Sequence, residues 1–310
     1  MGTMKRFRVA APLFAVAIAA LASAPKPVRA DGDEVEKRER CATRVSIALH
    51  GASASPALLG AANPQDQVDA MLADPSFVER FARFTNSEFN PQPGVNAAED
   101  ASYTLAKYVL TNKKPWSELF VGGYDVTNTV TADATGLGYF RSDAWMKRYA
   151  GNEQAGYRLS SAYRILQNTT GLQLTATTNV QGVDLTATGR QAAACAGCHY
   201  QNWYALDKVA KILSRRKGMG ANMTFLEPTE GPQQILGGKT LANDKELVTA
   251  LVESTNFKVN ACRLAFKYLY GRAENTCEAQ VFERCVDAFT KDQTMQSALA
   301  AVAKDPTFCQ

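Results

Sequence analysis

The sequence predicts a mostly α-helical protein in which helical, bundle-like domains flank a shorter central segment. Apolar residues recur at helical spacing along most of the chain, as Phe77, Phe81 and Phe84 illustrate. Residue types that start and stop helices, such as Asn243 and Gly271, border several of these segments. The stretches without a helical period contain Gly, Pro or Thr, which favour turns and loops.

The first 30 residues have the pattern of an export signal that is removed. Lys5, Arg6 and Arg8 precede an apolar run at 9–24, and Val28-Arg29-Ala30 places small residues at the two positions that a signal peptidase recognises. Cleavage near Ala30 gives a periplasmic or secreted protein. The apolar run is too short for a membrane-spanning helix, so we expect no stable membrane anchor. The alternative is a buried N-terminal helix.

The charge of the exported part is close to neutral. The whole chain has 34 basic and 30 acidic residues, and five of the basic ones lie in the first 30 positions. The remaining 29 basic and 30 acidic residues give a net charge of −1. Nucleic-acid-binding domains carry a basic footprint, so the composition argues against a nucleic-acid partner.

An N-terminal helical domain is expected at 31–170. Its aromatic stripe, Phe77, Phe81 and Phe84, is interpreted as core, because such stripes more often pack inside a protein than bind a ligand. The predicted helices lie at 31–51, at 64–72, along the aromatic stripe, and at 98–111, 142–150 and 157–168.

A central segment is expected at 171–242 and a C-terminal helical domain at 243–310. In the central segment we predict loop or short extended structure to 189, a helical pattern from Arg190 to Leu213, and a long loop from Lys217 to Ala242. The C-terminal helices are predicted at 243–254, 257–270, 277–290 and 293–303, with Asn243 and Thr276 as N-caps and Gly271 ending the second of them.

One short motif carries chemistry. Cys195-Ala196-Gly197-Cys198-His199 has the C-x-x-C-H spacing of c-type haem attachment. Two thiols three positions apart can bond the two vinyl groups of one porphyrin, and the adjacent histidine then supplies an axial imidazole ligand to the iron. Haem of this type is attached outside the cytoplasm, which agrees with the export signal. We therefore expect one covalent haem c.

Two other uses of a C-x-x-C pair are less well supported. A redox-active dithiol is expected near a βαβ pattern, and the sequence shows none. A zinc site needs a second pair of ligands at suitable spacing, and the chain has no second C-x-x-C.

The second axial ligand stays open between three alternatives. Met219 and Met223, in the loop after the motif, could each donate a thioether sulfur, which raises the reduction potential. His50 is the only other histidine of the chain. Water or an open position is the third alternative. The other methionines that we considered fit better as core residues, namely Met71, Met146 and Met295.

The residues after the motif have two interpretations each. Trp203, Tyr204 and Leu206 either pack on the porphyrin or belong to ordinary helix core. The basic residues close to them steer an acidic redox partner, pair with haem propionates or simply face solvent; they are Lys208, Lys211, Arg215, Arg216 and Lys217.

Seven cysteines are present, and five lie outside the motif: Cys41, Cys262, Cys277, Cys285 and Cys309. An odd number permits at most two internal disulfides and leaves one thiol over. Four of the five lie in the last 49 residues, so we expect at least one bridge between C-terminal helices. The sequence leaves the pairing open, and the alternative is a fully reduced, buried set.

Three parts of the chain together resemble the planctomycete-type cytochrome-c-like family, in which a haem domain adjoins helical domains of unknown function. They are residues 44–51 with 71–83, the haem motif at 195–199, and residues 247–272 with 298–308. That family usually has an Asp-Pro turn shortly after the haem histidine, where this chain has Tyr200-Gln201-Asn202-Trp203-Tyr204. The resemblance implies a redox role and no defined substrate.

The sequence thus favours an exported monohaem c-type cytochrome that transfers single electrons between protein redox partners of unknown identity. The alternatives are a haem enzyme, such as a peroxidase-like catalyst, and a haem sensor or structural subunit, each with an open iron position. Electron transfer is favoured over catalysis.

Overall fold

The computed structural model describes residues 30–94, 100–150, 158–175, 182–218 and 224–310. Within them the fold is mostly α-helical, which confirms the predicted class. The helices are α1 Ala30–His50, α2 Pro56–Leu59, α3 Val68–Leu72, α4 Pro75–Phe89, α5 Ala101–Thr111, α6 Glu118–Val121, α7 Asp143–Trp145, α8 Leu159–Thr170, α9 Ala193–Ala196, α10 Leu206–Lys211, α11 Asp244–Val252, α12 Thr255–Tyr270, α13 Ala279–Asp292 and α14 Met295–Ala303.

Single helical turns and three short hairpins complete the described structure. The turns are η1 Pro64–Gln67, η2 Met146–Ala150, η4 Gly189–Gln191, η5 Gly197–Gln201, η7 Thr276–Glu278 and η8 Pro306–Cys309. The antiparallel pairs are β1 Tyr124–Val126 with β2 Val130–Ala132, β3 Arg215–Lys217 with β4 Thr224–Leu226, and β5 Gln233–Ile235 with β6 Lys239–Leu241.

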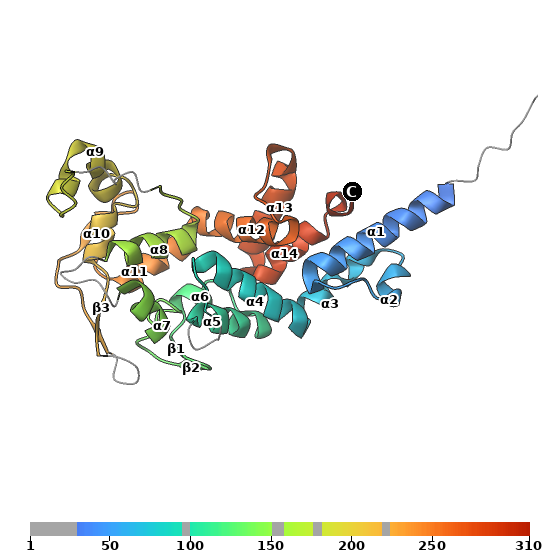
Figure 1. The fold of residues 1–310 in the computed structure, drawn as a ribbon, viewed down its shortest axis with the longest axis horizontal. Helices are drawn as coiled ribbons and strands as arrows, with labels where there is room; N and C mark the ends of the chain where they lie inside the picture. The colour runs from blue at the N-terminus through green and yellow to red at the C-terminus, as the bar shows by residue number, and fades with distance from the viewer. Residues whose placement is uncertain (1–29, 95–99, 151–157, 176–181, 219–223) are drawn as a thin grey trace, which may run out of the picture.

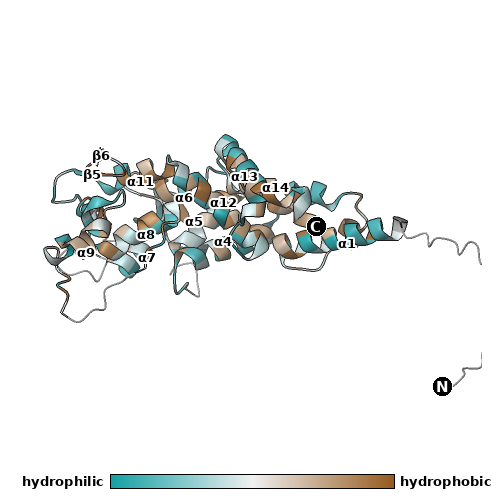
Figure 2. Ribbon diagram, turned by 90° about the horizontal axis from the view of Figure 1, so that it is seen from above, coloured by the Kyte–Doolittle hydropathy of each residue, from teal (hydrophilic) through white to brown (hydrophobic). Residues whose placement is uncertain are grey.

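The molecule is elongated, with α1 at one end and α9 and α10 at the other (Figure 1). The view from above shows the same order along the long axis, with α4, α5, α12 and α14 in the middle (Figure 2). Helices of both predicted helical domains share one core, because α12 packs on α8 and α4, and α14 packs on α3 and α13. Among the described residues, no helix is both long and apolar enough to cross a membrane.

The aromatic stripe of α4 lies in this core, as predicted. Asp74 caps the helix by accepting a hydrogen bond from the Ser76 amide, and Pro75 occupies the first turn, where its missing N–H costs nothing. Phe77 and Phe81 are fully buried. The ring of Phe81 meets the ring of Tyr268 from α12 edge-on, at 4.9 Å between centroids. This contact joins the two predicted helical domains.

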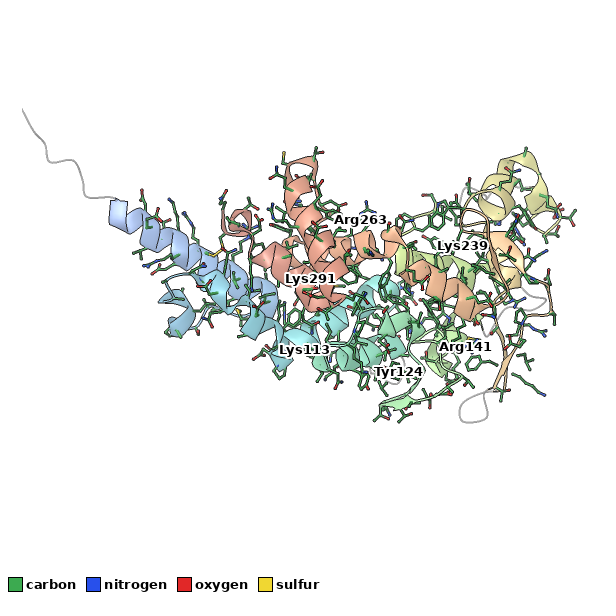
Figure 3. All side chains as sticks on the ribbon, turned by 180° about the vertical axis from the view of Figure 1, so that it is seen from behind. Lys113, Tyr124, Arg141, Lys239, Arg263 and Lys291 are labelled. Atoms are coloured by element: carbon green, nitrogen blue, oxygen red, sulfur yellow. A yellow bond between two sulfur atoms is a disulfide. The ribbon has the colours of Figure 1, made fainter. Side chains whose placement is uncertain are left out.

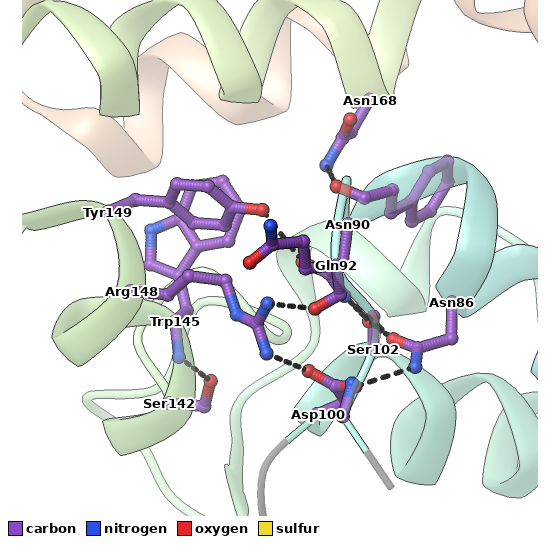
Figure 4. A network of polar contacts seen from close by, with 12 residues as sticks. Asn86, Asn90, Gln92, Asp100, Ser102, Ser142, Trp145, Arg148, Tyr149 and Asn168 are labelled. Atoms are coloured by element: carbon purple, nitrogen blue, oxygen red, sulfur yellow. Dashed lines mark hydrogen bonds and ion pairs between the residues drawn. The ribbon is translucent and has the colours of Figure 1, made fainter.

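A buried polar network fixes the junction of α4, α5 and η2 (Figure 4). Asp100 accepts from Asn86 at 2.8 Å and forms an ion pair with Arg148 at 2.6 Å. Tyr149 donates to Asn90 at 2.9 Å. A buried charge is costly unless it is paired and hydrogen-bonded, and Asp100 has both kinds of partner.

The C-terminal helices agree with the predicted boundaries, with one correction. Asn243 caps α11, and Gly271 ends α12 with a φ of 70°. Thr276 is not the N-cap of the next helical segment. Asn275 is, because its side chain accepts from the Cys277 amide while Glu278 accepts from the Asn275 amide at 3.0 Å.

Two expectations for the central segment were wrong in part. The helical pattern from Arg190 to Leu213 is interrupted, because the π-helical turn η5 closes with a bond from the Asn202 amide to the Gly197 carbonyl at 2.8 Å and the chain then bends before α10. The loop predicted at 217–242 contains β4, β5 and β6. The turn between β5 and β6 is made by Leu236, Gly237 and Gly238, all with positive φ, a conformation that glycine adopts readily.

The cysteines form two bridges, the largest number that the five cysteines outside the motif permit. Cys41 of α1 joins Cys309 of η8, and Cys262 of α12 joins Cys285 of α13. The second pair is the expected link between C-terminal helices. Cys277 is exposed and free.

Candidate haem-attachment site

The C-x-x-C-H motif spans a helical turn at the end of the molecule opposite α1 (Figure 1). Cys195 belongs to α9, and its amide donates to the Ala192 carbonyl at 2.8 Å. Cys198 and His199 follow in η5. Because side chains three positions apart lie on the same side of a helical turn, the local structure places both thiols on one face.

The two motif thiols are free, whereas four of the other five cysteines are paired. Cys195 is buried and Cys198 is exposed. Two unpaired thiols three positions apart on one turn are the arrangement that a C-x-x-C-H motif offers for haem attachment.

His199 is held by a carboxylate from the next helix. Its Nδ1 lies 2.7 Å from Oδ2 of Asp207, in α10. Asp207 is buried, with 6% of its surface exposed, and receives two further bonds from the guanidinium of Arg190, in η4. These run from Nε to Oδ2 at 2.9 Å and from Nη2 to Oδ1 at 2.6 Å. Side chains from three separate elements, η4, η5 and α10, therefore meet at the Asp207 carboxylate.

The charges of this cluster decide which ring nitrogen carries the proton. Burial alone would raise the pKa of Asp207, but the hydrogen bonds and charge of Arg190, together with the bond from His199, outweigh it and lower that pKa. An ionised carboxylate only accepts hydrogen bonds, so Nδ1 of His199 carries the hydrogen and donates. The lone pair of Nε2 is then left to bind a metal.

A second contact orients Cys198. Its sulfur lies 3.3 Å from the hydroxyl of Tyr204, and that oxygen accepts from the Asn202 amide group at 3.0 Å. The hydrogen bond to Cys198, followed by burial, raises the pKa of Tyr204, so its hydroxyl keeps its proton. Since Asn202 occupies the oxygen as a donor, the Tyr204 hydrogen is available to the sulfur.

Trp203 presents an open aromatic surface beside the motif. Its side chain is 37% exposed, and its ring meets that of Tyr204 edge-on at 5.4 Å between centroids. The carbonyl of Trp203 accepts from the Leu236 amide at 2.8 Å, so the β5–β6 hairpin supports this bend. Tyr204 and Leu206 are buried. A large exposed indole next to two free thiols and a metal-binding histidine suits contact with a flat apolar ring.

The candidate second ligands are not brought together with His199. His50 ends α1, its Nε2 lies 3.3 Å from the Met71 carbonyl, and it lines a cavity of about 370 Å³. Figures 1 and 2 place α1 and α9 at opposite ends of the molecule. Met219 and Met223 lie outside the described residues, in the connection between β3 and β4. Met71, Met146 and Met295 are buried, as expected of core residues.

The residues of the predicted basic cluster differ in their exposure and in their ion pairing. Lys211 pairs with Glu230 at 3.1 Å, and Lys217 is exposed on β3. Lys208 and Arg215 are half-buried. The side chain of Arg216 lies outside the description. The role of this cluster stays a prediction.

Comparison with known proteins adds no further information about the site. No family model, curated protein or solved structure matches the chain. Within the described residues, no three His, Cys, Asp or Glu side chains gather into a cluster that could hold a metal ion by themselves. The family resemblance and the haem site therefore stay predictions.

Three residues of this site were not predicted from the sequence, namely Arg190, Asp207 and Asn202. Asp207 lies eight positions after His199, and a continuous helix would separate the two residues by about 12 Å along its axis. The contact exists because η5 ends at Gln201 and the chain bends before α10. A signal was present in the acidic residue itself, because Asp207 falls among apolar residues in an otherwise buried stretch, where an acidic side chain needs a partner.

Proposed function

We propose that this chain is an exported c-type cytochrome that holds one haem c on Cys195 and Cys198, with His199 as an axial ligand. It passes single electrons between protein redox partners. The observation that carries the proposal is the anchored His199, whose Nδ1 is fixed on Asp207 so that Nε2 is left for iron, immediately after two free thiols.

The protein's own residues would attach the haem, orient it and form its surroundings. Haem supplies reversible one-electron chemistry at iron when it is bound. Cys195 and Cys198 form the thioether links, and the Tyr204 hydroxyl steadies the sulfur of Cys198. The exposed Trp203 would pack against part of the ring. Two covalent bonds and one histidine would fix the haem in place, which suits electron transfer.

Export to an oxidising compartment is supported by two independent features. The first is the signal pattern of residues 1–30. The second is the pair of disulfides, Cys41–Cys309 and Cys262–Cys285, because such bridges form and persist mainly outside the cytoplasm. Haem attachment to a C-x-x-C-H motif occurs in the same compartment.

The test of attachment uses cysteine variants produced in a bacterium able to mature c-type cytochromes. Haem that survives denaturation and acid–acetone extraction is measured by the pyridine haemochrome spectrum. We expect about one haem per chain in the parent, less in Cys195→Ala and in Cys198→Ala, and none in the double variant. Cys277→Ala, which removes another free thiol, should retain full haem content. A parent without covalent haem, or a double variant that keeps it, contradicts the proposal.

A haem catalyst with an open iron position is the second candidate. The Asp207–His199 contact favours this candidate. A carboxylate that accepts a hydrogen bond from Nδ1 makes Nε2 of the imidazole a stronger electron donor to iron. Donation of electron density to iron favours cleavage of the O–O bond. Carbon monoxide distinguishes the two. An optical spectrum of the ferrous protein that carbon monoxide leaves unchanged supports electron transfer with two protein ligands. A shifted spectrum supports catalysis or sensing.

A further inference from the structure

The clamp of Arg190, Asp207 and His199 points to a role beyond holding the haem. We propose that Asp207 is a positioning residue that keeps the axial imidazole rich in electrons and thereby lowers the reduction potential of the haem. This inference rests on the proposed function, since it concerns the iron that His199 would bind.

The geometry of the contact is that of a strong, charge-assisted hydrogen bond. The Nδ1–Oδ2 distance is 2.7 Å, in the range expected when the acceptor is ionised. The carboxylate side chain is 7% exposed and the imidazole 21%. Water competes little for the bond, and a hydrogen bond in such surroundings is electrostatically stronger than one in water.

Arg190 fixes the acceptor in place. Its guanidinium spans both oxygens of Asp207, and its own side chain is 8% exposed. A further bond joins this guanidinium to the Leu185 carbonyl, so the arginine is itself tied to the backbone before η4. Both carboxylate oxygens are occupied, and the ring of His199 is therefore restricted to one orientation.

The chemical consequence follows from the charge. An imidazole that donates Nδ1–H to a carboxylate gains negative character and becomes a more basic ligand through Nε2. A more basic ligand stabilises ferric iron more than ferrous iron. Hydrogen bonding to a ligand and burial are among the means by which a protein sets a haem potential. Asp207 provides the hydrogen bond, and its burial keeps water from weakening it.

The test compares midpoint potentials of the haem-loaded protein and of Asp207→Asn by spectroelectrochemical titration. The amide keeps the size of the side chain and removes its charge. We expect the ferric-to-ferrous equilibrium to shift toward ferrous by about tenfold, which for one electron equals an increase of about 59 mV. A shift of less than twofold, or a shift in the opposite direction, overturns the proposal.

The chain contains a matched control. Asp244 is a second buried aspartate that accepts two bonds from one arginine, Arg141, at 2.6 and 3.2 Å, and its side chain is also 7% exposed. Arg141 is labelled in Figure 3. The other partner of Asp244 is the Ser214 hydroxyl instead of a histidine. Asp244→Asn therefore removes the same kind of ion pair and should leave the midpoint potential unchanged.

A second measurement needs no variant and covers a failure of Asp207→Asn to fold. Nuclear magnetic resonance detects the Nδ1–H proton of His199 in the diamagnetic ferrous protein. Carbon monoxide is added if the iron has an open coordination position. We expect this proton to be protected from exchange with water, and fast exchange overturns the proposal. Covalent haem content is measured in every sample. Its absence from the parent refutes the proposed function, whereas normal haem content with an unshifted potential refutes only the role of Asp207.

Discussion

Removal of the Cys262–Cys285 bridge should weaken the folded state by a predictable amount. The two cysteines are 23 positions apart and lie on α12 and α13. Both are fully buried. The double variant Cys262→Ala/Cys285→Ala opens the loop between these helices, and the main cost arises because the unfolded chain regains conformations that the bridge had excluded.

The size of the effect follows from the loop length. For a loop of about 24 residues, the chain-entropy relation gives about 12 cal/mol/K, or about 3.4 kcal/mol at 25 °C. The Cys41–Cys309 bridge is present in both the parent and the double variant, so its contribution cancels in the difference between their free energies of unfolding. We therefore expect the free energy of unfolding to fall by about 3 kcal/mol.

The assay is urea unfolding of the purified protein with its disulfides intact, followed by far-ultraviolet circular dichroism. The double variant should unfold at a lower urea concentration and with a larger dependence on urea, since its unfolded chain exposes more surface. Cys277→Ala, which replaces the exposed free thiol in η7, is the control and should change the free energy of unfolding by less than about 0.5 kcal/mol. A loss below about 1 kcal/mol in the double variant would refute the reasoning.

Two further predictions concern the helical body. The carboxylate of Glu79 is partly buried, which raises its pKa, but bonds from Lys107 and Tyr103 outweigh this and lower it from 4.5 to about 2. Its stabilisation is therefore complete above pH 4.5 and is lost as the pH falls toward 2, so urea titrations of Glu79→Gln should show a deficit of about 1–2 kcal/mol at pH 7 that disappears near pH 2. Gly138 has a φ of 49°, and an added Cβ would lie 2.2 Å from the Leu119 carbonyl oxygen. Gly138→Ala should lower the melting temperature by several degrees, whereas Gly231→Ala, where nothing lies within 4 Å, should not.

The helical framework was predictable because it depends on local signals. The stripe of Phe77, Phe81 and Phe84 marks the side of α4 that faces the core, although Phe84 itself is only partly buried. Gly271 ends α12 because a residue with positive φ is needed there. Such signals act over three or four residues. The link between C-terminal helices was predicted on another ground, namely that four cysteines lie within the last 49 residues.

The surroundings of the motif were not predictable in the same way. Periodicity extended one helical pattern from Arg190 to Leu213, whereas the structure has a π-helical turn and a bend inside that range. Only the bend brings Asp207 back to His199. The hairpin that supports Trp203 depends on three consecutive residues with positive φ, of which only Gly237 and Gly238 were recognisable as turn formers.

The bridge between Cys41 and Cys309 has a consequence for a protein exposed to proteases. The two cysteines are 268 positions apart, so the bridge closes most of the chain into a covalent ring. Residues 182–188, just before the motif, are exposed and offer a site for cleavage. A single cut there opens the ring without releasing a fragment. The nicked molecule keeps its full mass until the disulfide is reduced, and the end bearing the C-x-x-C-H motif stays joined to the end bearing α1.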